Sequence, residues 1–205
     1  IIATPVPDRP GEFTVVVSAD RQMGLIELRF SGRFGRSNPR PFLVGERPEF
    51  IAPATNTTAP NAIALPFETT ANCRVYPNTA AWFRFEARAG QRFFARVQAR
   101  DLASRLVPDL MITDSAGREI AQARRRELLD FTAPSTGTFL LRLNDQTYRG
   151  GDDYHFRLTL TEAPQLDLAL PNSLHAGETN RVTLFGRKLP GGTALPFPAP
   201  DGRPW

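Results

Sequence analysis

Oxygen-bearing side chains bracket a loop with the sequence NDQTYRGGDD. They are Asn144, Asp145, Asp152 and Asp153. Oxygen-rich loops are how proteins hold hard cations, so this loop is a candidate calcium site, although its spacing is not that of an EF-hand. A turn is the other interpretation, because aspartate is a common turn former and Gly150–Gly151 lets the chain reverse. Calcium is the only cofactor that the sequence suggests, and nothing in the sequence requires a cofactor.

Aromatic and basic side chains form a second candidate site. They share the outward phase of expected strands: Trp82, Arg84, Arg96, Arg142 and Arg157, with Phe94 and His155 on the same phase. On an exposed sheet, such side chains stack on sugar rings or pair with acidic groups. We therefore predict a face that binds an extracellular polymer, either a polysaccharide or a collagen-like protein. The alternative is that Trp82 and Phe94 are buried beneath a loop or a neighbouring segment.

Residues for catalysis are scarce. The sequence has no G-x-S-x-G, H-E-x-x-H, P-loop or C-x-x-C motif. His155 and His175 are the only histidines and neither lies in a motif, so the sequence offers few candidates for a catalytic general base. The single cysteine, Cys73, is expected to be a buried structural thiol. We therefore expect that this chain is not an enzyme.

The charge pattern bears on the partner. The 205 residues carry a formal net charge of +4, and Lys188 is the only lysine among the basic residues. The arginines are scattered among carboxylates rather than clustered, so we do not expect a nucleic-acid partner. No apolar run approaches the roughly 18 residues that a membrane-spanning helix needs.

Strands must position these side chains. Residues 81–87, 93–99, 139–143 and 154–160 alternate apolar and polar positions with a period of two. Such alternation is typical of strands with one buried face. Turns with glycine at 89–90, 115–117 and 135–137 separate the segments, and glycine supplies the positive φ that tight hairpins need. The pattern predicts one antiparallel β-sandwich.

The motifs of residues 62–163 resemble a bacterial pre-peptidase C-terminal (PPC) domain. AWFRFEARAG, DLMITDSAG, FTAPSTGTFLLRL and YHFRLTL follow in the family's order D-W-F-x-F-x-A-x-x-G, L-x-L-x-D-x-x-G, F-x-A-P-x-x-G-x-Y-x-L-x-V and Y-x-L-x-V. Ala81 departs from it, because an acidic residue often precedes the aromatic pair, and this weakens a calcium or turn role at that position. The resemblance implies a sandwich of jelly-roll type, and some PPC-type domains bind calcium.

The flanking segments resemble pieces of immunoglobulin-like IPT/TIG domains. In residues 1–52 the run that resembles a domain ending is Gly35, Ser37, Pro39, Phe42 and Val44. In residues 164–205 the run that resembles a domain beginning includes Pro171, Gly177, Thr179, Gly186 and Leu189. The polar stretch 53–61 is interpreted as a linker. Two arrangements stay open: the flanks pair into one Ig-like module, or they belong to separate neighbours in a longer array.

These features favour a non-catalytic binding or spacer module of a large exported bacterial surface protein. Its expected location is extracellular or at the cell surface, and its expected partners are an extracellular polymer or neighbouring modules of the same protein. The alternative is an accessory domain that aids secretion or substrate targeting for a secreted hydrolase such as a peptidase. A catalytic domain elsewhere in the full protein would favour the alternative, and further Ig-like and PPC modules would favour the surface protein.

Overall fold

The fold is all-β, as predicted. The computed structural model describes residues 2–177 and 179–192, and within them the only helical turns are the 3₁₀ segments η1 (Ala59–Asn61) and η2 (Arg100–Leu102). The chain divides into two compact units, Ile1–Thr161 and Glu162–Trp205. In the described residues, no helix is long and apolar enough to cross a membrane.

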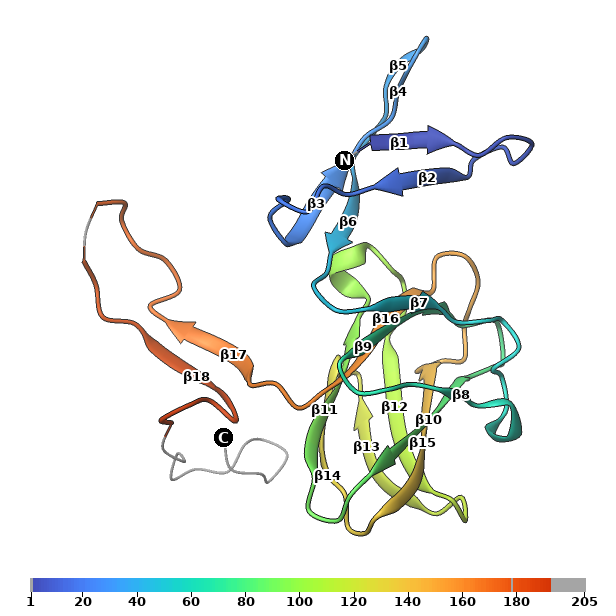
Figure 1. Cartoon of the computed structure of the whole chain (residues 1–205), viewed down its shortest axis with the longest axis vertical. Coiled ribbons are helices and arrows are strands. Elements are labelled where there is room, and N and C mark those ends of the chain that lie inside the picture. The colour runs from blue at the N-terminus through green and yellow to red at the C-terminus, as the bar shows by residue number, and fades with distance from the viewer. Residues whose placement is uncertain (1, 178, 193–205) are drawn as a thin grey trace. The chain divides into compact units, whose positions relative to one another are not determined.

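Two five-stranded sheets form a sandwich within the first unit (Figure 1). The sheet here called the β15 sheet has the order β13-β12-β15-β10-β8, with β8 (Ile63–Ala64), β10 (Ala81–Ala87), β12 (Pro108–Asp114), β13 (Glu119–Arg124) and β15 (Gly137–Asp145). The other, the β16 sheet, has the order β14-β11-β16-β9-β7, with β7 (Glu49–Ile51), β9 (Thr69–Arg74), β11 (Arg92–Gln98), β14 (Leu128–Thr132) and β16 (His155–Thr161). Pairing is antiparallel except at two edges, where β8 and β7 run parallel to their neighbours.

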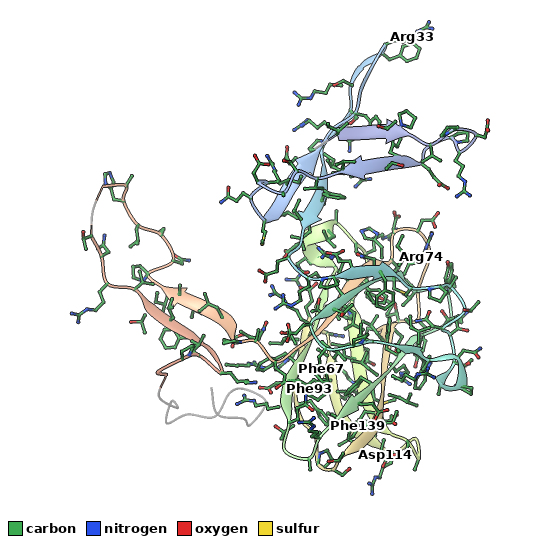
Figure 2. All side chains as sticks on the ribbon, viewed as in Figure 1. Arg33, Phe67, Arg74, Phe93, Asp114 and Phe139 are labelled. Atoms are coloured by element: carbon green, nitrogen blue, oxygen red, sulfur yellow. The ribbon has the colours of Figure 1, made fainter. Side chains whose placement is uncertain are left out.

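Phenylalanine rings fill the space between the sheets. Phe85 and Phe139 of the β15 sheet meet Phe93 and Phe131 of the β16 sheet, with ring centroids 5.1 Å apart for Phe85–Phe93 and 5.7 Å apart for Phe131–Phe139. Figure 2 shows the labelled Phe93 and Phe139 side chains within the sandwich. Because these residues occupy alternate positions of their strands, the period-two pattern correctly predicts which face of each strand enters the core.

Glycine turns reverse the chain, but most of them do not join paired strands. Gly117, with φ of +80°, closes a true hairpin between β12 and β13, where Asp114 Oδ1 accepts hydrogen bonds from the amides of Ala116 (3.0 Å) and Arg118 (2.9 Å). Gly90, with φ of +78°, instead leads from β10 in one sheet to β11 in the other. The turn at 135–137 likewise leads from β14 to β15. Hairpins at these two turns were a wrong expectation, because turn conformation fixes a reversal and not the pairing partner.

The sandwich reaches into the segments assigned above to a flank and a linker. β7 is an edge strand of the β16 sheet, and the Ala52 amide continues its pairing by donating to the Asn72 carbonyl at 2.8 Å. Asn56, which is buried, brackets β10: its carbonyl accepts from the Trp82 amide at 2.8 Å and its Nδ2 donates to the Trp82 carbonyl at 3.2 Å. Residues from Glu49 onward are therefore built into the sandwich.

The N-terminal residues form three two-stranded ladders. β1 (Ile2–Pro5) pairs with β2 (Phe13–Val16), β3 (Gly24–Leu28) with β6 (Arg40–Val44), and the short β4 (Ser31–Gly32) with β5 (Gly35–Arg36). The rings of Phe13 and Phe30 contact each other with centroids 4.5 Å apart, while Val16 and Leu25 are exposed. Two-stranded ladders have marginal stability alone. Their assignment to an Ig-like domain stays a prediction.

The second unit contains one ladder in its described residues. β17 (Gln165–Leu170) pairs with β18 (Thr183–Arg187), with an irregular register between Leu166 and Leu168. Leu166, Leu168 and Leu184 are all exposed on this ladder. Residues 193–205 of the expected 164–205 segment lie outside the described residues, and its pairing with residues 1–52 stays a prediction.

Candidate functional site

Three of the predicted ligand residues meet on the outer face of the β15 sheet. In the register of β10 and β15, Trp82 lies opposite Arg142 and Arg84 lies opposite Leu140. Arg142 also lies opposite Met111 of β12. Side chains directly opposite on one face of a sheet have Cβ atoms about 5 Å apart, so Trp82, Arg142 and Met111 form a continuous row. We call this row together with Arg84 the tryptophan face.

The arginines of the tryptophan face have no carboxylate partner among the described residues. Nearby acidic groups are engaged elsewhere: Glu86 Oε1 accepts from Thr138 Oγ1 at 2.6 Å, and Asp109 Oδ1 accepts from Gln122 Nε2 at 2.9 Å. Arg142 Nε is buried and no hydrogen-bond partner is found for it within the described part of the chain. A ligand cannot reach this buried Nε directly, but guanidinium groups without a carboxylate partner can hold a negatively charged ligand beside an indole ring.

Sequence reasoning missed Thr113 and Met111, which β12 contributes to the same face. Thr113 lies opposite Leu140, and its buried Oγ1 is another polar atom for which the described residues provide no partner. A buried polar atom without a hydrogen bond is costly, and such atoms are uncommon in folded proteins. The alternation of PDLMITD is a signal that could have placed both residues on the outward phase, but a local pattern does not show that β12 lies beside β15.

Arg96 and Arg157 lie on the opposite side of the sandwich. They belong to β11 and β16, and their side chains occupy the outer face of the β16 sheet. The expectation of one shared face is therefore corrected to two faces. The physical reason is that alternation fixes which side of a strand is buried, while the sheet that the strand joins depends on distant pairing. Ligand binding by these residues stays a prediction.

The outer face of the β16 sheet is itself largely buried. Phe94 is 0% exposed, which matches the interpretation of a covered ring rather than an exposed one. The Arg92 guanidinium carbon lies 5.8 Å from the centroid of this ring, and the same guanidinium binds Asp130 with two hydrogen bonds of 3.0 and 2.7 Å. Aromatic and charged side chains therefore pack against one another on this face.

Arg157 is an internal ion-pair residue. Its Nη2 donates to Glu49 Oε1, which ties β16 to the edge strand β7. Burial lowers the pKa of the Arg157 guanidinium, and the negative charge of Glu49 opposes that shift. The ring nitrogens of His155 lie near backbone carbonyls, with Nε2 3.0 Å from Leu102 O and Nδ1 3.3 Å from Asp152 O, and the neutral ring has one N–H to donate to one of them.

The Asp145 carboxylate accepts hydrogen bonds that anchor the loop following β15. Oδ1 accepts from Thr147 N at 2.9 Å, Thr147 Oγ1 at 2.7 Å and Arg149 N at 3.2 Å, and Oδ2 accepts from Val107 N at 3.0 Å. Burial acts to raise the pKa of this carboxyl, but the hydrogen bonds outweigh burial and the pKa lies below its usual value. The carboxylate therefore has protein donors on both oxygens.

The other three predicted calcium ligands each interact with a different partner within the protein. Asn144 is buried and its Nδ2 donates to the Asp145 carbonyl at 2.8 Å, whereas Asp152 is exposed and pairs with Arg74. Asp153 contributes its backbone carbonyl, which accepts from the Arg105 amide at 2.8 Å. Over residues 2–177 and 179–192, no group of three or more His, Cys, Asp or Glu side chains is arranged to hold a metal ion. The calcium site stays a prediction that this arrangement does not favour.

Cys73 is half-buried rather than fully buried, but its chemistry is that of a structural thiol. It packs against the core, and burial raises its pKa to about 11. A thiol with so high a pKa is protonated near neutral pH and is a poor nucleophile.

Comparison with known proteins gives only distant likenesses. No family model and no curated protein matches the chain. Among solved structures, the pre-peptidase C-terminal domain of a collagenase from Bacillus anthracis is similar over 57% of this chain and 99% of its own, at 11% identity and a TM-score of 0.39. A periplasmic inhibitor of g-type lysozyme from Aeromonas hydrophila is similar over 55% of this chain and 98% of its own, at 8% identity and a TM-score of 0.36. Likeness at this level does not bear on what the chain binds.

Proposed function

We propose that this chain is a non-catalytic binding module of an exported protein, and that its tryptophan face binds an acidic polysaccharide. The observation that carries the proposal is the row Trp82–Arg142–Met111 with Arg84 beside it. The row combines an indole ring with guanidinium groups that have no carboxylate partner in the described residues. A sugar ring offers a C–H face to the indole, and a carboxylated sugar offers an anion to the arginines.

The choice of an acidic polysaccharide over a collagen-like protein rests on charge. Arg84 is exposed and Arg142 is half-buried on the same face, so two positive charges lie next to one ring. Retention of a polyanion by such a face depends on salt, because exposed charges are screened within about 8 Å at physiological ionic strength. The same face would serve either a surface protein or the accessory domain of a secreted hydrolase.

Affinity electrophoresis of the full chain through gels that contain polygalacturonate, alginate or neutral cellulose derivatives tests the proposal. We expect the two acidic polymers to retard the chain, and Trp82→Ala and Arg142→Gln to weaken the retardation roughly fivefold or more. Arg84→Gln, at an exposed position, gives the same readout if the Trp82 variant folds poorly.

Arg96→Gln is the matched control. Arg96 is an exposed arginine on the opposite face, so this variant loses the same charge without touching the tryptophan face. Equal weakening by Arg96→Gln and Arg142→Gln would mean that net charge or the Arg96 face retains the polymer, and the tryptophan face would then have no specific role. No retardation by either acidic polymer would leave a spacer module, and pull-down by insoluble collagen, run in parallel, would then identify a protein ligand instead.

A further inference from the structure

A groove of about 650 Å³ lies in the first unit where β7 ends and β9 continues. Its lining includes Ile51, Pro53, Asn72, Arg74, Tyr76 and Asp152. The last backbone bond between the two segments runs from the Ala52 amide to the Asn72 carbonyl, and β9 extends beyond it to Arg74. Small-ligand pockets occupy about 300–1,000 Å³, so the groove has a suitable size.

Arg74 is held in this groove from two sides. Its Nη1 forms an ion pair with Asp152 Oδ1, and its guanidinium carbon lies 5.9 Å from the centroid of the Tyr76 ring. The His155 ring lies near the backbone carbonyls of Leu102 and Asp152, as described above. The polar side chains of the groove therefore have contacts within the protein that direct them toward one another.

The groove contains both hydrogen-bond donors and hydrogen-bond acceptors, and the charges of Arg74 and Asp152 offset each other. Arg74 retains N–H donors beyond the one in its ion pair, and Tyr76 carries a hydroxyl that can donate or accept. The second carboxylate oxygen of Asp152 and the amide oxygen of Asn72 are acceptors for which the described residues give no hydrogen-bond donor. Because Arg74 and Asp152 neutralise each other, the groove favours an uncharged ligand.

Part of the lining is apolar. Ile51 is 86% exposed and lies beside Asn72 in the register of β7 and β9, and Pro53 and Ala54 also line the groove. The lining therefore combines the apolar surfaces of Ile51 and Tyr76 with polar groups. A sugar ring matches this distribution, since its C–H faces are apolar and each of its hydroxyls both donates and accepts.

We propose that this groove is a second binding site, independent of the tryptophan face, and that it takes a neutral sugar residue of an uncharged polysaccharide. The sugar ring packs against the apolar surfaces of Ile51 and Tyr76, with its hydroxyls toward Asn72, Arg74 and Asp152. The site differs in ligand class from the tryptophan face, where unpaired arginines favour an anion.

Amide chemical shifts of the full chain, titrated with cellohexaose, chitohexaose, maltohexaose and xylohexaose, test the site. We expect at least one of the four to shift amides of residues 51–54 and 72–76. Tyr76→Ala should weaken that binding by roughly fivefold to tenfold, because it removes one aromatic contact. Asp152→Asn, at a side chain that is 92% exposed, should weaken it without changing the melting temperature.

Arg118→Gln is the matched control, because Arg118 forms a similar exposed ion pair with Asp114. Figure 2 shows Asp114 at the end of the sandwich away from Arg74. The proposal is overturned if none of the four saccharides shifts these amides at about 10 mM, or if Arg118→Gln weakens binding as much as Asp152→Asn. Shifts by a proline-rich peptide but by no saccharide would also overturn it, and would identify a peptide groove.

Discussion

Changing Asp145 to asparagine removes the buried charge that anchors the loop from Asp145 to Arg149. In the native protein one carboxylate oxygen accepts from Thr147 and Arg149, and the other accepts from the Val107 amide. An asparagine that keeps its oxygen toward Thr147 and Arg149 turns its NH₂ group toward Val107. That places two donors face to face and leaves the Val107 amide without an acceptor.

The expected loss in the free energy of unfolding follows from the hydrogen bonds that the substitution removes or weakens. Hydrogen bonds to a charged group contribute about 1.5–3 kcal/mol each, and a buried donor left unpaired costs about 1–3 kcal/mol. One lost bond and three weakened ones give an expected loss of about 3 kcal/mol in the free energy of unfolding, allowing for relaxation of the loop.

The loss should depend on pH. The folded-state pKa of Asp145 lies below its unfolded value, so its contribution is fully present above the unfolded pKa and is lost as pH falls through the folded pKa. The stability difference between the native protein and Asp145→Asn should therefore be constant near neutral pH. It should begin to shrink as the pH drops below about 4, where the unfolded carboxyl titrates.

Urea unfolding of the full chain, followed by far-ultraviolet circular dichroism at several pH values, measures both effects. Asp153→Asn is the control, because this neighbour is exposed and a surface change of this kind usually stays within about 0.5 kcal/mol. A loss below about 1 kcal/mol, or a difference that is the same at pH 7 and pH 3, would refute the assignment of Asp145 as the loop anchor.

Three further outcomes follow from the same contacts. Because protein donors already occupy both oxygens of Asp145, EDTA and millimolar calcium should leave the melting temperature unchanged. A rise in the melting temperature with calcium would instead support the calcium site predicted from the sequence. Cys73 should react with iodoacetamide at pH 8 at least about a hundredfold more slowly than free cysteine, since a pKa of about 11 leaves little thiolate, and fast labelling of the folded chain would contradict the raised pKa. Asp130→Asn should lower the free energy of unfolding by about 1–2 kcal/mol, because one bond from Arg92 is lost and the other is weakened, and a smaller loss in urea titrations would show that the pair is screened by solvent.

The strands that carry the core could be predicted from the sequence because their side chains obey a local rule. Phe83 and Phe85 alternate with polar residues, and each is buried between the sheets as the alternation requires. Local patterns do not encode long-range pairing, however. Nothing near Trp82 or Arg96 in sequence reveals that their strands join different sheets, so a single ligand face was expected where the molecule has two.

The acidic loop and the groove show a second limit. Asp145 and Asp152 have the same side chain and lie in one loop, but Asp145 is buried among backbone donors and Asp152 is exposed beside Arg74. The difference comes from Val107 and Arg74, which are distant in sequence. The groove depends on β7 ending earlier than β9, and the length of a parallel edge pairing has no sequence signal of its own.

The buried outer face of the β16 sheet has a consequence for the tolerance of substitutions. In β10, tolerance should alternate residue by residue, because positions such as Arg84 face outward and are exposed. In β11, Phe93, Phe94 and Ala95 are consecutive and all fully buried. A deep mutational scan should therefore find an unbroken sensitive run in β11. A method that reads strand orientation from alternating tolerance would misassign this strand, although its geometry is that of an ordinary pleated strand.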